Sequence, residues 1–505
     1  MKRNNQISGL FLRTKLLLLL VVLLISSCNL VKPAPEVVVL PKDQRPNILF
    51  VMLDDLDAEM NSISYMKNLQ ELVVARGTSL DDFLITNPNC CPSRSTILRG
   101  QYTHSHQVFH NTAPDGGFVK FNEVGNDAST LGVWLQEAGY RTALIGKYLN
   151  GYPLGDDRAY IPPGWSEWYS PAKGNAYDGY DYVLNENGVL IPYSPAEANY
   201  FTDVASRKAV DFIQRAGQDD IPFFLFLTLF APHEPSTAAN RHRDLFPSIT
   251  VPASPSSNEA DVSDKPIDMS RNPLLTDEIV SSLDQKYRQR ILSLQAVDEM
   301  FAELVKVLEQ TGQLDNTYIV FTSDNGYHFG QHRLVEGKGT FYKEDIIVPF
   351  IVRGPGVTEN RTVAGFLAGN VDIPLTIADW AGVVPPDFVE GRSLAKVLAG
   401  DPAPEKDCRE AYLLEYYTPA DANDGSASKG ITAPYKLGLR TTEYLYVEHS
   451  NGFVEFYDLI TDPYELENIA STADPAQLEH FSKWLKAFSR CSGSGCVQVD
   501  MGLPE

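Results

Sequence analysis

The sequence predicts an α/β fold, in which a large, mostly parallel β-sheet is flanked by helices and a smaller subdomain with an antiparallel sheet follows. Three observations predict it. Four apolar runs each end in polar residues, segments with helical periodicity lie between the runs, and short aromatic segments crowd together after about residue 394. Alternating strands and helices are typical of a parallel sheet covered by helices, whereas closely spaced short strands are typical of an antiparallel sheet.

The four apolar runs are expected to form strands that are buried on both faces. They span residues 47–53, 142–146, 223–229 and 317–322. Open α/β sheets bind ligands beyond the carboxyl ends of their strands. The polar residues that follow the runs therefore form a candidate active site, and they are Asp54, Asp55, Lys147, His233, Asp324 and Asn325.

Helical periodicity predicts the segments that cover this sheet. We expect helices over residues 65–76, over 131–138 with Ser129 as the N-cap, and over 291–310. The stretch 236–273 is rich in Ser, Pro and Asp, which predicts a long surface insertion near the site rather than a domain boundary.

The aromatic segments after residue 394 predict the strands of the second sheet. A last helix is expected over 475–490. These patterns predict a catalytic domain over 46–393 and a C-terminal subdomain over 394–505. The expected antiparallel strands span residues 411–417, 435–440, 444–447 and 453–457.

The N-terminal 45 residues predict export. Basic residues precede an apolar run, 16–25, which is too short to span a bilayer as a helix and has the pattern of a secretory signal. The run leads into Ser-Ser-Cys28, which resembles a bacterial lipobox; a plain signal peptide with an incidental cysteine is the alternative. We predict a lipoprotein signal peptide over 1–27, a lipidated Cys28, a tether over 28–45 and a lipid-anchored protein of the bacterial cell envelope, periplasmic or at the cell surface.

Charge and cysteine content limit the partners and the redox compartment. The net charge of −23 argues against nucleic acid as a partner, and an anionic substrate would need a locally basic pocket and a bound cation. Cys491 and Cys496 are close enough in sequence for a local disulfide in an exported protein. Cys91 and Cys408 are open to two interpretations, as two buried thiols or as a bridge.

A short motif carries the most specific chemical information in the chain. In Cys90-Cys91-Pro92-Ser93-Arg94, the first cysteine lies two residues before proline and four before arginine. This spacing resembles the signature of the type I sulfatases, in which that cysteine is oxidised to formylglycine. The converted residue would be Cys90, because Cys91 is one position out of register.

The resemblance extends from about residue 45 to residue 470. Beyond the cysteine motif, the local matches are similar to N-acetylglucosamine-6-sulfatases and extracellular heparan sulfate 6-O-sulfatases, and they cover residues 146–151, 323–331, 348–356 and 457–465. The resemblance implies an alkaline phosphatase-like domain with a smaller C-terminal sheet domain.

The candidate metal ligands are hard oxygen donors, and they are Asp54, Asp55, Asp324 and Asn325. Such a set suits Ca²⁺ or Mg²⁺ rather than zinc. The resemblance favours Ca²⁺, with the formylglycine formed from Cys90 and a sulfate oxygen completing the ligands. The alternative for an Asp-Asp pair is a solvated turn or a helix cap.

The resemblance also implies a covalent mechanism. One hydroxyl of the formylglycine hydrate attacks sulfur and expels the alcohol, and the second then lets the sulfate leave. A helix that begins just after Cys90 would favour negative charge there, and the metal would lower the pKa of the hydrate. A serine has no second hydroxyl, so its sulfate ester would persist.

Four further residues take roles from their positions in the family pattern. Arg94 orients the nucleophile, Lys147 and Lys338 contact sulfate oxygens, and His233 is a candidate general acid for the leaving oxygen. The alternative for such lysines and for this histidine is an exposed surface position. Many sulfatases carry a histidine where this chain has Leu149, which leaves open what assists the nucleophile; the next residue, Asn150, is one candidate.

Four other histidines are weaker candidates for substrate binding. His104 and His106 follow the motif and either contact the substrate or are structural. His328 and His332 resemble positions at the rim of the site that would read sugar hydroxyls.

These observations predict an enzyme that removes sulfate from sulfated glycans or small sulfate esters, with the 6-O-sulfate of glucosamine as the expected target. It would depend on a formylglycine-generating enzyme or an anaerobic sulfatase-maturating enzyme. It would touch the membrane through its lipid anchor only. Two alternatives are a phosphodiester or phosphonate monoester hydrolase on the same scaffold, and a glycan-binding lipoprotein without catalysis.

Overall fold

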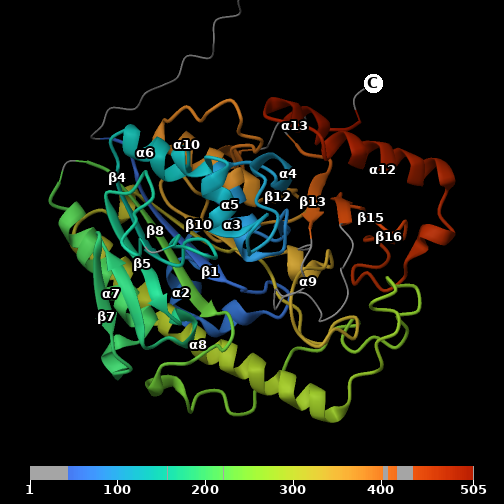
Figure 1. Cartoon of the computed structure of the whole chain (residues 1–505), viewed down its shortest axis with the longest axis horizontal. Helices are drawn as coiled ribbons and strands as arrows, with labels where there is room; N and C mark the ends of the chain where they lie inside the picture. The colour runs from blue at the N-terminus through green and yellow to red at the C-terminus, as the bar shows by residue number, and fades with distance from the viewer. Residues whose placement is uncertain (1–43, 156, 220, 402–407, 418–435, 504–505) are drawn as a thin grey trace, which may run out of the picture. The chain divides into compact units, whose positions relative to one another are not determined.

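A ten-stranded sheet organises the part of the chain that the structure describes (Figure 1). The computed structural model describes residues 44–155, 157–219, 221–401, 408–417 and 436–503. The strand order is β11-β2-β10-β9-β1-β8-β4-β5-β6-β7. The strands are β1 (Asn47–Asp54), β2 (Thr78–Leu80), β4 (Arg141–Gly146), β5 (Glu167–Gly174), β6 (Tyr182–Glu186), β7 (Val189–Tyr193), β8 (Phe223–Pro232), β9 (Thr317–Ser323), β10 (Phe350–Arg353) and β11 (Arg361–Val363). A separate parallel pair consists of β3 (Phe83–Leu84) and β12 (Ala368–Gly369).

The four predicted apolar runs are strands β9, β1, β8 and β4, which lie side by side and run parallel. Every residue of β1 and β8 is buried, so neither strand shows alternating polar positions. Antiparallel pairing appears toward the sides of the sheet, where β10 pairs with β9 and β2 and where β5, β6 and β7 form a meander. The sheet is mixed but mostly parallel, which confirms the predicted fold class.

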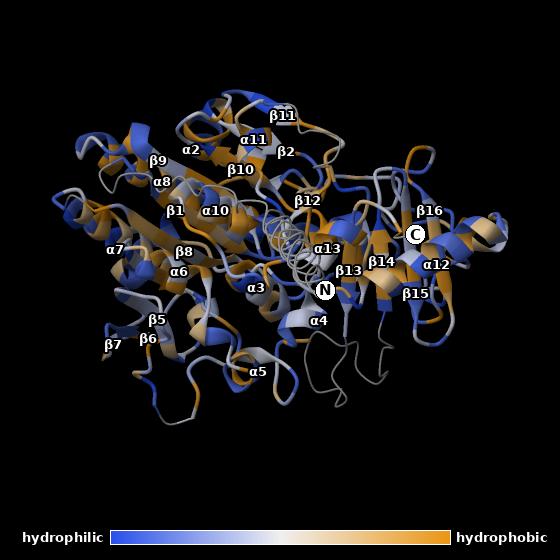
Figure 2. Ribbon diagram, turned by 90° about the horizontal axis from the view of Figure 1, so that it is seen from above, coloured by the Kyte–Doolittle hydropathy of each residue, from blue (hydrophilic) through white to orange (hydrophobic). Residues whose placement is uncertain are grey.

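Helices cover both faces of the sheet. One hydrophobic core lies under α2 (Lys67–Leu72), α7 (Phe201–Ala216) and α8 (Asp277–Gln310). A second core on the opposite face includes residues of α3, α5, α6, α10 and α11. In Figure 2, strands β1 and β8 are largely orange, whereas α7 shows both blue and orange residues, as a helix with one buried face should. The helices of the second layer are α3 (Cys90–Arg99), α5 (Gly117–Glu123), α6 (Leu131–Glu137), α10 (Ile373–Ala381) and α11 (Ala395–Leu398), with the short α4 (Thr103–His106) and α9 (Lys343–Ile346) nearer the second sheet.

Three helix boundaries differ from the sequence predictions. The segment 65–76 is not one helix, because Met66 leaves helical geometry before α2 and the chain tightens into a 3₁₀ turn after Val73. Thr130, rather than Ser129, caps α6: its side chain accepts a hydrogen bond from the amide of Val133. Helix α8 begins well before the predicted residue 291, because the side chain of its N-cap, Thr276, accepts a hydrogen bond from the third helical amide.

A four-stranded antiparallel sheet follows, with the order β13-β14-β15-β16, as predicted. Its core also takes in Tyr102 and Phe341 from the earlier part of the chain, so a domain boundary at 393/394 stays a proposal. The last predicted helix is α12, after which a further short helix, α13, follows. The elements are β13 (Tyr412–Tyr416), β14 (Lys436–Arg440), β15 (Tyr444–His449), β16 (Val454–Asp458), α12 (Pro475–Phe488) and α13 (Ser494–Val499).

The predicted disulfide is present between Cys491 and Cys496. Cys91 is a buried thiol and is not bonded to Cys408. The predicted signal peptide, the lipidation site Cys28 and most of the tether lie outside the described residues. Within the described ranges, we find no helix that is both long and apolar enough to cross a membrane.

An ion cluster holds β4, β5 and α7 together. Glu167 opens β5 and accepts hydrogen bonds from Arg141 Nη2 (2.7 Å to Oε1) and Arg215 Nη2 (2.7 Å to Oε2). Burial raises the pKa of Glu167, but the two arginines outweigh burial and lower the pKa from 4.5 to about 2. The ionised form of Glu167 therefore stabilises the folded state.

Glu167→Gln is expected to reduce the free energy of unfolding by about 1–2 kcal/mol at neutral pH, because each pKa unit corresponds to about 1.4 kcal/mol and solvent screens the partly exposed Arg215. Because the folded-state pKa is depressed, this stabilisation is fully present above pH 4.5 and is lost as the pH falls toward 2. Urea unfolding of the wild type and the variant at a series of pH values measures it. Glu137→Gln, at an exposed helix position, is the control. If the difference in free energy of unfolding between Glu167→Gln and the wild type does not shrink at acid pH, the ionised Glu167 carboxylate is not the source of the stabilisation.

Candidate active site

The polar residues predicted to follow the central strands do meet at one edge of the sheet. Asp54 is the last residue of β1, and Lys147 directly follows β4. His233 directly follows β8, and Asp324 directly follows β9. Asp55 has a positive φ of 65°, which turns the chain sharply at the end of β1. The strand order places β1 between β9 and β8, so the site is centred on the aspartate pair.

The acidic residues form a compact, buried set of oxygen donors. Ligand atoms of Asp54, Asp55, Cys90 and His233 all lie within 4.8 Å of one another. Asp324 Oδ1 accepts a hydrogen bond from the amide of Asp55 (3.1 Å), which brings the β9 end of the site against the β1 end.

Asn325 completes this set. Its Nδ2 donates to Asp55 Oδ1 (2.7 Å), so its amide lies directly against the aspartate pair. Three carboxylates and one amide in so small a volume fit a hard divalent cation such as Ca²⁺ or Mg²⁺.

Cys90 is the first residue of α3, so the predicted helix is present but begins at the cysteine rather than just after it. Its amide donates to the side chain of the N-cap residue Asn89 (3.1 Å). Its Sγ lies 3.6 Å from Asp54 Oδ1 and 2.7 Å from Lys338 Nζ. Burial raises the pKa of the Cys90 thiol to about 12, against the opposing effect of Lys147 and Lys338. The sulfur therefore stands between the aspartates and a cation at the start of a helix.

Three cations surround the sulfur and the aspartates: Lys147 and Arg94 are buried, and Lys338 is partly buried. Lys147 Nζ donates to Asp54 Oδ2 (2.6 Å). Lys338 Nζ donates to Asp55 and Cys90. Arg94 Nε donates to Asp324 Oδ2 (2.7 Å). The structure thus places both lysines and the arginine of the sequence prediction inside the cluster rather than on the surface.

Arg94 has an additional feature. Its Nη1 donates to Thr228 Oγ1 (2.7 Å), a β8 residue that the sequence did not single out. Its Nη2 has no hydrogen-bond partner among the described residues, although it lies 3.8 Å from Asp54 Oδ1. The guanidinium is therefore fixed on one side and offers a buried donor on the other.

The cations set the charge of the aspartates. Burial raises the pKa of Asp54, but Lys147, His233 and Arg94 outweigh burial and hold the pKa well below its usual range. Burial lowers the pKa of Lys147, but Asp54 outweighs it and raises this pKa above its ordinary value. Both partners are therefore charged at neutral pH.

A cavity of about 1520 Å³ opens onto this cluster. Asp55, Cys90, His233 and Lys338 line its floor, and residues 266–269 of the predicted insertion line part of its wall. Strands β15 and β16 contribute further wall residues. The insertion and the second sheet together therefore give the site room for a ligand larger than sulfate.

His233 lines the cavity and has an aromatic neighbour. Its Nε2 is 3.6 Å from Asp55 Oδ2, and its Nδ1 lies 2.7 Å from the backbone oxygen of Glu234. Tyr177 packs against the imidazole at 4.5 Å between ring centroids and lies 5.2 Å from the Lys147 ammonium. Sequence reasoning missed Tyr177, because it belongs to a short 3₁₀ turn without any periodic pattern. Leu149 is in the core, whereas Asn150 lines the cavity.

The four weaker histidine candidates separate into two groups. His328 lines the cavity, and its Nδ1 lies 2.9 Å from Asp345 Oδ1. His106 is buried against Thr96 (3.1 Å), and His332 is buried against Glu259 (2.7 Å). His104 forms hydrogen bonds with Glu415 in β13 and with the backbone oxygen of Cys491, in the loop that the disulfide closes. His104, His106 and His332 are not among the cavity-lining residues, because buried partners hold their rings elsewhere.

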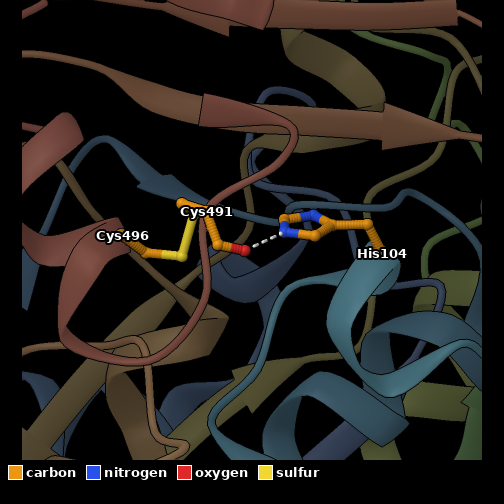
Figure 3. A group of neighbouring side chains, drawn as sticks. All are labelled: His104, Cys491 and Cys496. Carbon is orange, nitrogen blue, oxygen red and sulfur yellow. Dashed lines mark hydrogen bonds between the residues drawn. A yellow bond between two sulfur atoms is a disulfide. The ribbon is translucent and has the colours of Figure 1, made fainter. Parts of the chain in front are cut away.

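Figure 3 shows the surroundings of His104. Its Nε2 lies 3.0 Å from the carbonyl oxygen of Cys491, and its Nδ1 lies 2.9 Å from Glu415 Oε1. The two sulfur atoms beside it are bonded to each other, so Cys491 and Cys496 offer no thiolate to a metal. This histidine joins the segment after α3 to the C-terminal part of the chain.

Comparison of the sequence with protein families and with known proteins finds sulfatases in both cases. The family model named Sulfatase matches residues 46–383, and the model named N-sulphoglucosamine sulphohydrolase, C-terminal, matches residues 330–488. The chain is 32% identical to the human N-acetylglucosamine-6-sulfatase over 480 residues, which cover 90% of this chain and 86% of the human one. It is 38% identical to a Sulf-1 homolog of Caenorhabditis elegans over 402 residues, which cover 78% of this chain but only 54% of that protein.

Comparison with solved structures finds proteins of the same fold. A solved structure described as a complex with its substrate, D-glucosamine-2-N,6-O-disulfate, superposes with a TM-score of 0.72 at 26% identity and covers 88% of this chain and 97% of the other. A phosphonate monoester hydrolase of Agrobacterium radiobacter superposes with a TM-score of 0.66 at 21% identity and covers 86% and 93%. The second similarity shows that the fold is shared and says nothing about the reaction.

Proposed function

Because the chain belongs to the sulfatase family, we propose that it hydrolyses sulfate esters of sulfated glycans, with the 6-O-sulfate of glucosamine as its target. One observation carries the proposal: Cys90 lies in a buried cluster with the aspartates and cations, and this cluster is the floor of a large cavity. The target sugar is supported by the names of the relatives and by the substrate described for the structural neighbour.

We propose that Cys90 is oxidised to formylglycine and that its hydrate is the nucleophile. The Asp54, Asp55, Asp324 and Asn325 oxygens are the proposed ligands of Ca²⁺, with Mg²⁺ as the alternative ion. When bound, the ion supplies positive charge that favours the ionised nucleophile and neutralises sulfate. Because Cys90 begins α3, the free amides of that helix also favour negative charge at this position.

The chain's own cations and histidine supply the remaining parts. Lys147 reaches the cluster at Asp54, and Lys338 reaches it at Asp55 and Cys90. We propose that both contact sulfate oxygens, where negative charge develops during transfer. His233 lines the cavity beside Asp55, and in this proposal it donates a proton to the oxygen of the leaving alcohol. Arg94 fixes Asp324 and directs its unpartnered Nη2 toward the nucleophile side of the site.

A panel of defined substrates tests this function. Fully matured protein with Ca²⁺ is incubated with heparin disaccharides that carry a single 6-O-, 2-O- or N-sulfate, with aryl sulfate and with aryl phosphonate, and free sulfate or phosphonate is measured. We expect the 6-O-sulfated glucosamine substrate to have the highest kcat/KM. Cleavage restricted to 2-O-sulfate or aryl sulfate would overturn the target sugar. Faster cleavage of aryl phosphonate would favour the hydrolase alternative, and inertness toward every ester would favour the glycan-binding alternative.

Several further features stay proposals. We place the mature protein in the bacterial cell envelope through a lipid on Cys28, after removal of residues 1–27. We divide it into a tether over 28–45, a catalytic domain over 46–393 and a subdomain over 394–505. Maturation of Cys90 requires a formylglycine-generating enzyme or an anaerobic sulfatase-maturating enzyme.

A further inference from the structure

A second cluster of buried ionisable side chains lies outside the cavity. His332 comes from the segment after β9, Glu344 from α9, and Glu465 from the segment after β16. One ligand atom from each of the three lies within 4.8 Å of the others, and all three residues are buried. None of them lines the active-site cavity. The cluster therefore joins three segments of the chain without belonging to the site described above.

Two atoms of this cluster lack partners. His332 Nε2 and Glu344 Oε2 have no hydrogen-bond partner among the described residues. They face each other at 4.0 Å, which is beyond a hydrogen bond. The two residues are only 1% and 3% exposed, so water does not satisfy these atoms from the surface. Buried polar atoms normally have a hydrogen-bond partner, so these two atoms are available to a group bound between them.

The other ring nitrogen of His332 is held by a carboxylate. Its Nδ1 lies 2.7 Å from Glu259 Oε2, and Glu259 is in turn paired with Lys265 at 3.5 Å. When Nδ1–H donates to a carboxylate, the neutral ring directs its Nε2 lone pair toward Glu344. A histidine that binds metal has this same arrangement, because the carboxylate fixes the tautomer and the ring orientation.

The two glutamates are also positioned by other groups. Ser256 Oγ donates to Glu344 Oε1 (3.1 Å), which leaves Oε2 facing the histidine. Glu465 accepts hydrogen bonds from Arg440 Nη1 (2.6 Å) and the amide of Lys343 (2.9 Å). These contacts hold the carboxylates in place but leave each with lone pairs for a further partner.

Among the three carboxylates of this region, that of Glu344 has no basic partner within hydrogen-bond distance in the part of the chain that the structure describes. Glu259 is paired with Lys265, and Glu465 is paired with Arg440. The His332 Nε2 atom is 4.0 Å from Glu344 Oε2, so a proton on Nε2 would be too far from this oxygen for a hydrogen bond.

We propose that His332, Glu344 and Glu465 bind a divalent first-row transition-metal ion, for which Zn²⁺ is the probe. One imidazole and two carboxylates suit such an ion better than Ca²⁺, which prefers oxygen ligands alone. Ligands about 2.0–2.2 Å from a tetrahedral ion lie roughly 3.3–3.6 Å apart, so the side chains need to approach one another by at most about 1.5 Å. The ion ties the segment that carries Lys338 to α9 and to the segment after β16. This proposal is independent of the sulfatase reaction.

Metal titration of the purified full-length protein tests the site. Excess Ca²⁺ is kept present to occupy the oxygen ligands of the active site, and Zn²⁺ binding is measured by competition with a chromophoric chelator and by mass spectrometry of bound metal. Co²⁺ absorption reports the nitrogen and oxygen ligands directly. The variants are His332→Gln and Glu259→Gln, and His480→Gln on the exposed side of α12 is the matched control.

We expect one Zn²⁺ per chain in the wild type and in His480→Gln, and loss of this binding in His332→Gln. Glu259→Gln keeps all three ligands and is expected to weaken binding about 10–100-fold. Circular dichroism establishes that each variant is folded, and Glu259→Gln keeps the test decisive where His332→Gln does not fold. Absence of Zn²⁺ binding, equal binding by the histidine variant and the wild type, or a crystal structure with water between His332 and Glu344 would overturn the proposal.

Discussion

Replacement of Cys90 by alanine is expected to lower kcat/KM for a sulfate ester by at least about 10⁴-fold, the loss that is typical when a covalent nucleophile is removed. Replacement by serine is expected to behave differently. A serine hydroxyl at the same position can accept sulfate once, but it has no second hydroxyl with which to release it. Cys90→Ser should therefore give one equivalent of alcohol per chain and then stop. Rapid-mixing kinetics measures that burst, and intact-mass spectrometry measures a chain that has gained one SO₃ group.

The neighbouring cysteine provides the matched control. Cys91 is also buried on α3 but belongs to the hydrophobic core rather than to the cluster of aspartates. Cys91→Ala is expected to keep Cys90 in register for maturation and to retain turnover. A Cys90→Ala protein that turns over substrate at the wild-type rate, or a Cys91→Ala protein that loses all turnover while staying folded, would contradict the assignment of the nucleophile to residue 90.

Most of the active site could be predicted because its signals are local. Asp54, Lys147, His233 and Asp324 each stand directly at the end of an apolar run, and the parallel sheet brings these ends together. The cysteine motif similarly places Cys90 at the start of a helix within a few residues. A pattern of this kind needs no knowledge of distant partners, because strand direction alone determines where the side chains meet.

The features that were missed depend on distant contacts. His332 resembles a rim residue in sequence, but its partner Glu259 is 73 positions away and draws the ring into the interior. Tyr177 lies in a segment without a periodic sequence pattern, and only the tertiary structure brings its ring against His233. The break of the 65–76 helix likewise follows from the non-helical backbone of Met66, which helical periodicity does not encode.

The second large loss of activity is expected from replacement of Lys338, because its ammonium contacts the side chain of residue 90. Its ammonium donates to Asp55 and to Cys90, and burial lowers the pKa of Lys338 less than Asp55 and Cys90 raise it. The ammonium is therefore charged, desolvated and fixed before substrate arrives. A charge that is fixed in this way stabilises a transition state more than an exposed charge does, because no reorganisation is required during the reaction.

Lys338→Ala is accordingly expected to lower kcat by about 10²–10³-fold, the cost of removing one preorganised charge from such a site. Lys286→Ala is the matched control, because Lys286 also pairs with two carboxylates, Glu234 and Glu336, but is 42% exposed and outside the cluster. That variant should keep kcat within about threefold, as exposed pairs contribute little. Steady-state kinetics gives both values, normalised to the fraction of chains whose residue 90 is oxidised, since Lys338 contacts the sulfur that is modified. If Lys338→Ala and Lys286→Ala then lose activity to the same small extent, general positive charge near the cavity suffices, and the specific contact between Lys338 and residue 90 has no catalytic role.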